Sequence, residues 1–186
     1  MLRIFFVLVL LAGCAGKASA PSAPEAGAVP GKHSPAAESL FAKARALWQG
    51  DTCTEPQEAA LILDEALDGD PKFAAAWAYR GLAHSELGKR EEAFDDLTMA
   101  VRLDPRAEYY AYRGLVSLRG GVLSAARRDL EYSLEKDPQQ YRAWNILGDT
   151  ALREGNAAQA CKYYANGCSQ GECEPLRQAR NDGQCK

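Results

Sequence analysis

The sequence predicts an all-α fold, an α-solenoid of about four helix-turn-helix repeats with a short capping helix at its C-terminal end. The block Ala-Trp-Ala-Tyr-Arg-Gly-Leu at 76–82 is echoed by Tyr-Tyr-Ala-Tyr-Arg-Gly-Leu at 109–115, 33 residues later. The dipeptide Asp-Pro at 104–105 recurs at 137–138, again 33 residues on. A fixed period of this length is typical of stacked copies of one supersecondary unit, each of which buries its apolar face against its neighbours.

The copy at 74–106 is the clearest, and its pattern predicts two helices. The first, over 74–87, has apolar residues close to helical spacing at Trp77, Leu82, Ala83 and Leu87. Gly88 then indicates a C-cap and a turn. The second helix resumes the amphipathic pattern at Ala93, Phe94, Leu97, Ala100 and Val101. Pro105 ends it, because proline disfavours helix in the residue before it and lacks an amide donor.

The remaining copies are expected at about 36–73, 107–140 and 141–168. In the first copy we expect an opening helix over about 35–49, a few inserted residues over 51–56, and a second helix that contains Ala59, Leu63 and Ala66. A cysteine-rich cap follows at 169–186, in which 175–181 is expected to form a short helix.

The order of residues within the copies resembles the tetratricopeptide repeat (TPR). The second copy supplies Gly81, Ala93, Leu97, Ala100 and Pro105; the third supplies Tyr110, Gly114, Ala126, Leu130 and Pro138; the fourth supplies Trp144, Leu147, Gly148 and Ala160. The chain departs from the family where Ser133 and Gly167 replace a usual alanine. The resemblance covers about 36–168 and implies a right-handed α-solenoid, with a TPR domain over 36–186 that includes the cap.

Small residues are expected where the two helices of a copy cross. Close approach of two backbones requires a minimal side chain at the crossing point. We therefore expect Gly81, Gly114 and Gly148 at the crossings, facing Ala93, Ala126 and Ala160.

Two charged pairs share one spacing, which supports this alignment of the copies with one another. Arg80 and Asp96 are 16 residues apart, and so are Arg113 and Asp129. The equivalent pairs in the fourth and first copies are both apolar or aromatic: Leu147 with Tyr163, and Ala42 with Ile62. Unless the match arises by chance, it indicates a contact between the helices of one copy, with a bidentate Arg–carboxylate pair where the residues are charged.

Residues 1–13 are expected to be a signal peptide. Arg3 precedes an apolar run at 4–11, which is too short to cross a membrane but typical of a secretory signal. Leu-Ala-Gly-Cys at 11–14 resembles the cleavage box of bacterial lipoproteins, which implies that Cys14 becomes a lipid-modified, palmitate-bearing N-terminus. The alternative is an ordinary signal peptide with an incidental cysteine. Ala15, in place of Asp, implies sorting to the outer membrane of a Gram-negative bacterium, facing the periplasm.

Residues 14–35 are expected to form a disordered tether behind the lipid anchor, because Ala, Pro, Ser and Gly dominate there and few apolar side chains can be buried. The chain carries a formal charge of −3, and loss of Arg3 makes it −4. This mild, mixed charge does not indicate a nucleic-acid partner. His33 and His84 are too isolated to indicate a catalytic or metal site, and no cofactor is expected.

The cysteines after Cys14 are expected to form disulfides, because a secretory signal implies an oxidising compartment. Cys161 and Cys168 lie seven residues apart on one helix, about 10 Å along its axis, and cannot bond to each other. An antiparallel cap would pair Cys168 with Cys173 and Cys161 with Cys185. Cys53 would remain free, or would pair with another chain. Zinc is the weaker alternative, since the close C-x2-4-C pairs of structural sites are missing.

The first helix of each copy is expected to line a concave groove that binds a protein or peptide of the cell envelope. The candidate groove residues are Tyr79, Leu82, Glu86, Tyr112, Leu115, Arg119, Asn145, Asp149 and Arg153. Alternatively, many of them only pack between copies. The expected function is a membrane-anchored adaptor or scaffold and not an enzyme. The alternatives are a self-assembling structural protein, which could dimerise through Cys53, and an enzyme acting on cell-wall material, which would need convergent catalytic groups.

Overall fold

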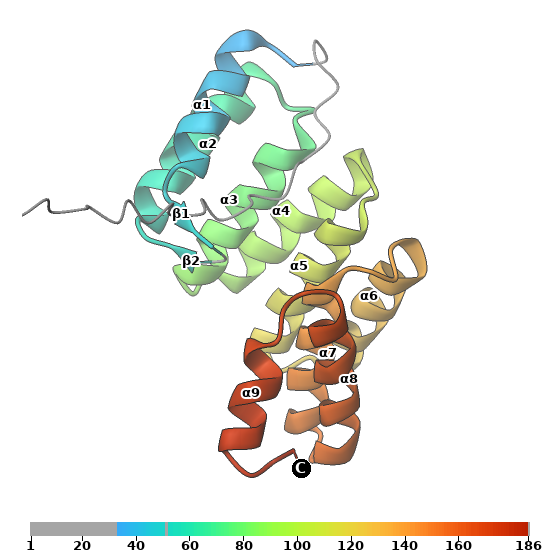
Figure 1. Ribbon diagram of the computed structural model, residues 1–186. Coiled ribbons are helices and arrows are strands. Elements are labelled where there is room, and N and C mark those ends of the chain that lie inside the picture. Colours follow the sequence, from blue (N-terminus) through green and yellow to red (C-terminus); the bar gives the residue numbers. More distant parts are fainter. Residues whose placement is uncertain (1–32, 51, 186) are drawn as a thin grey trace, which may run out of the picture.

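The computed structural model describes residues 33–50 and 52–185 (Figure 1), so the signal peptide, Cys14 and nearly all of the expected tether lie outside the described residues. The described chain forms nine helices and one short hairpin. The helices are α1 (Pro35–Arg45), α2 (Pro56–Gly69), α3 (Ala74–Glu86), α4 (Arg90–Leu103), α5 (Ala107–Arg119), α6 (Leu123–Lys136), α7 (Tyr141–Arg153), α8 (Ala157–Ser169) and α9 (Glu174–Asn181).

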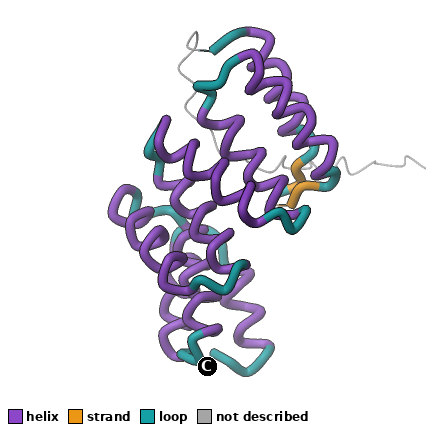
Figure 2. The backbone as a smooth tube through the Cα atoms, turned by 180° about the vertical axis from the view of Figure 1, so that it is seen from behind, coloured by secondary structure: helices purple, strands orange, loops and turns teal. Residues whose placement is uncertain are grey.

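The helices pack as four consecutive pairs: α1 with α2, α3 with α4, α5 with α6, and α7 with α8. The second helix of each pair also contacts the first helix of the next pair, so the pairs stack in chain order (Figures 1 and 2). The short helix α9 packs against α8 at the C-terminal end. The predicted all-α solenoid is therefore confirmed. None of the helices in the described segments has the length and apolar character needed to span a bilayer.

The first helix is shorter than the sequence predicts. It ends at Arg45, and the expected helical stretch up to residue 49 instead contains strand β1 (Trp48–Gln49), which pairs antiparallel with β2 (Thr52–Cys53). Gly50 allows the turn because its φ of 63° lies in the left-handed region that favours glycine. Thr54 donates two hydrogen bonds to the Leu47 carbonyl, from its backbone N–H and its hydroxyl, each at 2.9 Å.

Glycines mark the helix crossings, as predicted. A Cβ atom at Gly81 would lie 2.9 Å from Leu97 Cγ and 3.0 Å from the Ala93 carbonyl oxygen, and one at Gly114 would lie 2.8 Å from Leu130 Cγ. In the fourth pair the Tyr164 ring occupies the place of these leucines, against Gly148. The crossings therefore combine a missing side chain on one helix with a large buried one on the other.

The predicted Arg–Asp pairs are also confirmed. Arg80 donates to Asp96 through Nε (3.0 Å) and Nη2 (2.6 Å), and Arg113 donates to Asp129 through the same two nitrogens at 2.8 Å each. His84 lies on the same carboxylate, with Nδ1 at 3.0 Å from Asp96 Oδ2. Within the described residues, no group of three or more His, Cys, Asp or Glu side chains is arranged to hold a metal ion.

His33 belongs to the first repeat and not to the tether that the sequence predicts. Its ring stacks on Phe73 at 4.1 Å between centroids, and its Nδ1 lies 2.8 Å from Asp70 Oδ2. Ser34 then caps α1 by accepting a hydrogen bond from the Ala37 N–H at 3.1 Å. The ordered repeat thus begins before residue 35.

Candidate functional site

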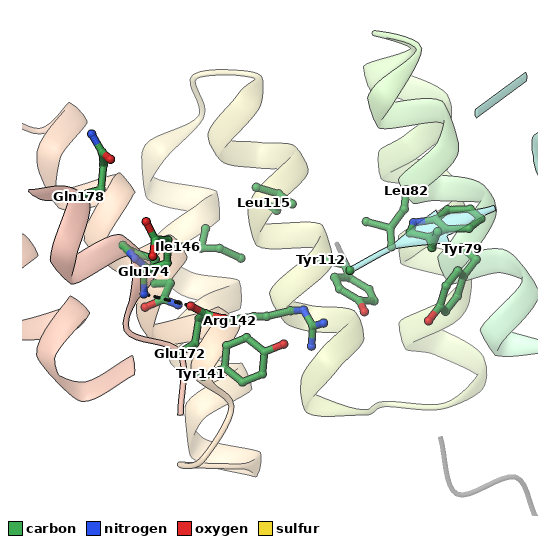
Figure 3. A pocket seen from close by; sticks show the side chains of 14 residues that line it. Tyr79, Leu82, Tyr112, Leu115, Tyr141, Arg142, Ile146, Glu172, Glu174 and Gln178 are labelled. Atoms are coloured by element: carbon green, nitrogen blue, oxygen red, sulfur yellow. Dashed lines mark hydrogen bonds between the residues drawn. The ribbon is translucent and has the colours of Figure 1, made fainter. Parts of the chain in front are cut away.

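The best-formed hollow in the described part of the chain is a groove of about 480 Å³ that crosses the first helices of the second, third and fourth pairs. Its wall is mainly aromatic and aliphatic. The side chains that form this wall come from the hairpin and from α3, α5 and α7: Trp48, Tyr79, Leu82, Tyr112, Leu115, Tyr141 and Ile146. Figure 3 labels the wall residues of α3, α5 and α7 around the groove, which the loop after α8 and helix α9 border at the other end.

Five of the nine candidate residues from the sequence line this groove: Tyr79, Leu82, Tyr112, Leu115 and Asn145. The other four lie outside it and join neighbouring parts of the solenoid. Arg119 pairs with Glu86 at 2.9 Å, and Arg153 donates to the Leu118 carbonyl at 2.8 Å. Asp149 accepts a hydrogen bond from the Tyr164 hydroxyl at 2.7 Å.

Several groove residues were not among the sequence candidates. Ile146 could have been found, because it stands two residues before Gly148, as Tyr79 and Tyr112 stand before their own glycines. The remainder depend on the placement of the hairpin, the start of α7 and the cap: Trp48, Tyr141, Arg142, Glu172, Glu174, Pro175 and Gln178.

The hairpin end of the groove is built from interlocking rings. Tyr79 meets Trp48 edge-on at 5.0 Å and Phe41 edge-on at 5.3 Å between ring centroids. The Arg45 guanidinium carbon lies 5.8 Å from the Tyr79 ring. Tyr79 is therefore oriented by side chains from both α1 and β1, which leaves its ring preorganised at the surface of the groove.

The middle of the groove combines two tyrosines with a cation. The Arg142 guanidinium carbon lies 4.8 Å from the Tyr141 ring and 6.0 Å from the Tyr112 ring, and Figure 3 shows this side chain pointing toward Tyr112. The Tyr112 hydroxyl donates to Glu108 Oε1 at 2.5 Å. Burial, reinforced by the Glu108 charge, raises the pKa of Tyr112 well above its usual value, so the hydroxyl remains protonated.

Asn145 explains why Gly167 replaces the usual alanine in the fourth repeat. A Cβ atom at Gly167 would lie 2.1 Å from Asn145 Oδ1, so the amide occupies the space that an alanine methyl would need. The two preceding repeats have alanine in place of Asn145, and they have Ala100 and Ser133 in place of Gly167. Asn145 is 9% exposed, and its Oδ1 is buried without a hydrogen-bond partner among the described residues.

The cap is joined to α8 by two cysteine pairs, Cys161 with Cys185 and Cys168 with Cys173. These are the pairs that the sequence predicts. Their positions hold α9 and the loop before it against α8, where Leu176 and Ala179 are buried with Tyr164. The cap thereby supplies the carboxylates of Glu172 and Glu174 to one end of the groove.

Cys53 carries a free thiol that is buried, with 6% of the residue exposed. Burial and the nearby Glu86 and Glu55 charges raise its pKa, although a hydrogen bond from the Glu55 backbone opposes them. A disulfide to a second chain would require this part of the protein to open.

Comparison with known proteins places the helix pairs in one family. A family model described as "Tetratricopeptide repeat" matches residues 54–108 and 110–169. The human tetratricopeptide repeat protein 13 is 29% identical over 114 residues, which are 61% of this chain and 13% of that protein. The chain spans between 13% and 19% of the length of the curated relatives that it matches.

Solved structures show the same fold. A thermophilic TPR protein of Thermus thermophilus superposes with a TM-score of 0.68 at 21% identity, over 80% of each chain. The first TPR domain of Spaghetti (RPAP3), bound to an HSP90 peptide, superposes with a TM-score of 0.58 at 25% identity. That match covers 64% of this chain and 94% of the Spaghetti domain.

Proposed function

This chain belongs to the tetratricopeptide repeat family, and on that premise we propose that it is an adaptor that holds a protein or peptide partner in the groove between the hairpin and the cap. TPR domains commonly mediate protein–protein interactions and are typically scaffolds, not enzymes. The adaptor acts in the bacterial cell envelope, anchored through a lipid on Cys14.

The observation that carries the proposal is the groove itself. Three successive repeats contribute aromatic or aliphatic side chains to one continuous wall, and the Tyr79 ring is already fixed by its neighbours. Tyrosine suits recognition because it provides a large contact area and a polar tip, and because ordering it costs little side-chain entropy. The related fold of the Spaghetti domain holds a peptide, which supports a peptide or protein segment as the ligand class here.

The envelope location rests on the N-terminal sequence and on the cysteine pairs. A lipid on Cys14 would hold the repeat domain near a membrane, in the outer membrane facing the periplasm if the organism is Gram-negative. The two cysteine pairs of the cap are expected to persist in such an oxidising compartment.

Crosslinking in intact cells of the native organism tests both parts of the proposal. The tagged wild type is compared with Cys14→Ala, which removes the anchor, and with Tyr79→Ala, which removes one ring from the groove. Tyr132→Ala is the matched control, because Tyr132 lies on α6 outside the groove and is 41% exposed.

A specific envelope protein should be recovered with the wild type and with Tyr132→Ala, and its yield should fall with Tyr79→Ala. Cys14→Ala should shift the protein from the membrane to the soluble fraction and reduce recovery of the partner. If Tyr79→Ala recovers as much of the envelope protein as the wild type does, the groove does not bind that partner. Recovery of only further copies of this chain would identify a self-assembling protein instead of an adaptor.

A further inference from the structure

We infer that the groove takes an extended peptide segment in which a proline or aliphatic residue is followed or preceded by a lysine or arginine, whose charge is held at the cap by Glu172 and Glu174. This inference rests on the proposed function and names the chemistry of its partner.

The groove has two chemically different ends. The hairpin end is aromatic, with Trp48 and Tyr79, and the cap end carries the carboxylates of Glu172 and Glu174. The one cation among the lining residues, Arg142, lies over the rings of two tyrosines, and Figure 3 shows it turned toward Tyr112. A ligand that matches both ends therefore carries an apolar group and a positive charge.

The carboxylates at the cap are positioned but not neutralised. Glu172 Oε1 accepts a hydrogen bond from the Glu174 backbone N–H at 3.0 Å, which holds the side chain in place without cancelling its charge. Glu174 pairs with Arg177 at 2.6 Å, but both side chains are about two-thirds exposed (66% and 67%). Exposed pairs of this kind contribute little free energy, so Glu174 can exchange Arg177 for a cation of the partner.

The course of the groove favours an extended chain. Its lining runs from the hairpin across α3, α5 and α7 to the cap, and an extended segment advances about 3.3 Å per residue, so a short stretch can meet both ends. Proline fits the aromatic end, because aromatic-lined grooves bind preformed polyproline-type segments at low entropic cost.

Selection from a phage-displayed library of random twelve-residue peptides tests the inference. The baits are the wild type with both cysteine pairs intact, the double variant Glu172→Gln with Glu174→Gln, and the control Glu135→Gln, which removes an exposed carboxylate on α6 away from the groove. The wild type and the control should enrich peptides that combine proline or aliphatic residues with lysine or arginine. The double variant should keep the apolar preference and lose the basic one.

The best wild-type peptide is then synthesised with its basic residue intact or replaced by glutamine. By fluorescence anisotropy, the double variant and the glutamine peptide should each bind about five- to tenfold more weakly, which corresponds to the loss of a partly exposed charge pair. Combining the two changes should cause little further loss, since both remove the same contact.

The outcomes separate this inference from the proposed function. Selected peptides without a basic preference, or a basic preference that persists in the double variant, would overturn the inference and leave the peptide-binding groove standing. The inference would also be overturned if the affinity lost in the double variant and the affinity lost with the glutamine peptide simply add when the two changes are combined. If the wild type enriches no peptides at all, both the inference and the assignment of the groove as a peptide site fail.

Discussion

Replacing Arg113 with leucine should strongly destabilise the third repeat, because it leaves Asp129 without its partner. The Asp129 side chain is 4% exposed and the Arg113 side chain is 16% exposed. Removing one partner of a buried pair costs about 3–5 kcal/mol, because the remaining charge stays buried without compensation. In a domain of about 150 residues, a loss of this size should lower the melting temperature by between about 6 and 20 °C.

The fourth repeat shows how the loss can be repaired. At the positions equivalent to Arg113 and Asp129 it carries Leu147 and Tyr163, which pack in one apolar cluster. A double variant, Arg113→Leu with Asp129→Tyr, installs the same pair in the third repeat. Well-packed apolar replacements of buried ion pairs are often neutral, so the double variant should lie within about 1.5 kcal/mol of the wild type.

The measurement is a double-mutant cycle by urea and thermal unfolding, followed by circular dichroism at 222 nm with the disulfides kept intact. Arg128→Leu is the matched control, because Arg128 is an exposed arginine on the same helix pair and should change stability by no more than about 0.5 kcal/mol. The coupling free energy between the two sites should be at least about 2 kcal/mol. A loss in Arg113→Leu no larger than in the control, or single losses that simply add in the double variant, would refute the reasoning.

Three further outcomes are expected. Gly114→Ala should lose about 1–3 kcal/mol of unfolding free energy, because its Cβ would lie 2.8 Å from Leu130 Cγ. Gly120→Ala, whose nearest neighbour would be 3.4 Å away, should lose less than about 0.5 kcal/mol, and equal losses would contradict the crossing geometry. The Cys53 thiol should react with iodoacetamide at pH 8 at least about tenfold more slowly in the folded protein than in urea, because it is buried and its pKa is raised; similar rates would show that it is accessible. Because burial raises the pKa of Tyr112, its contribution to stability should be fully present below the unfolded tyrosine pKa of about 10 and be lost at higher pH. Urea titrations between pH 9 and 11.5 should therefore show a steeper decline for the wild type than for Tyr112→Phe, and parallel curves would contradict this.

The family and the fold could be predicted from the sequence because each copy repeats the same local pattern. Helix spacing, the glycines at the crossings and the 16-residue separation of Arg113 and Asp129 depend on contacts within one helix pair. Such contacts leave a periodic trace that can be compared from copy to copy. For the same reason, the repeat pattern alone was enough to place Tyr79 and Tyr112 on the groove side of their helices.

The groove, by contrast, depends on contacts between segments that are distant in the sequence. Trp48 reaches it because Gly50 turns the chain into a hairpin where helical continuation was expected, and Glu172 reaches it because the cap folds back onto α8. Neither segment has an equivalent in the other repeats, so no periodic trace marks it. The Asn145 side chain on α7 fills the space that the missing side chain of Gly167 leaves on α8. The repeating framework therefore follows from local patterns along the chain, whereas the contacts that occur only once, at the two ends of the groove, depend on packing in three dimensions.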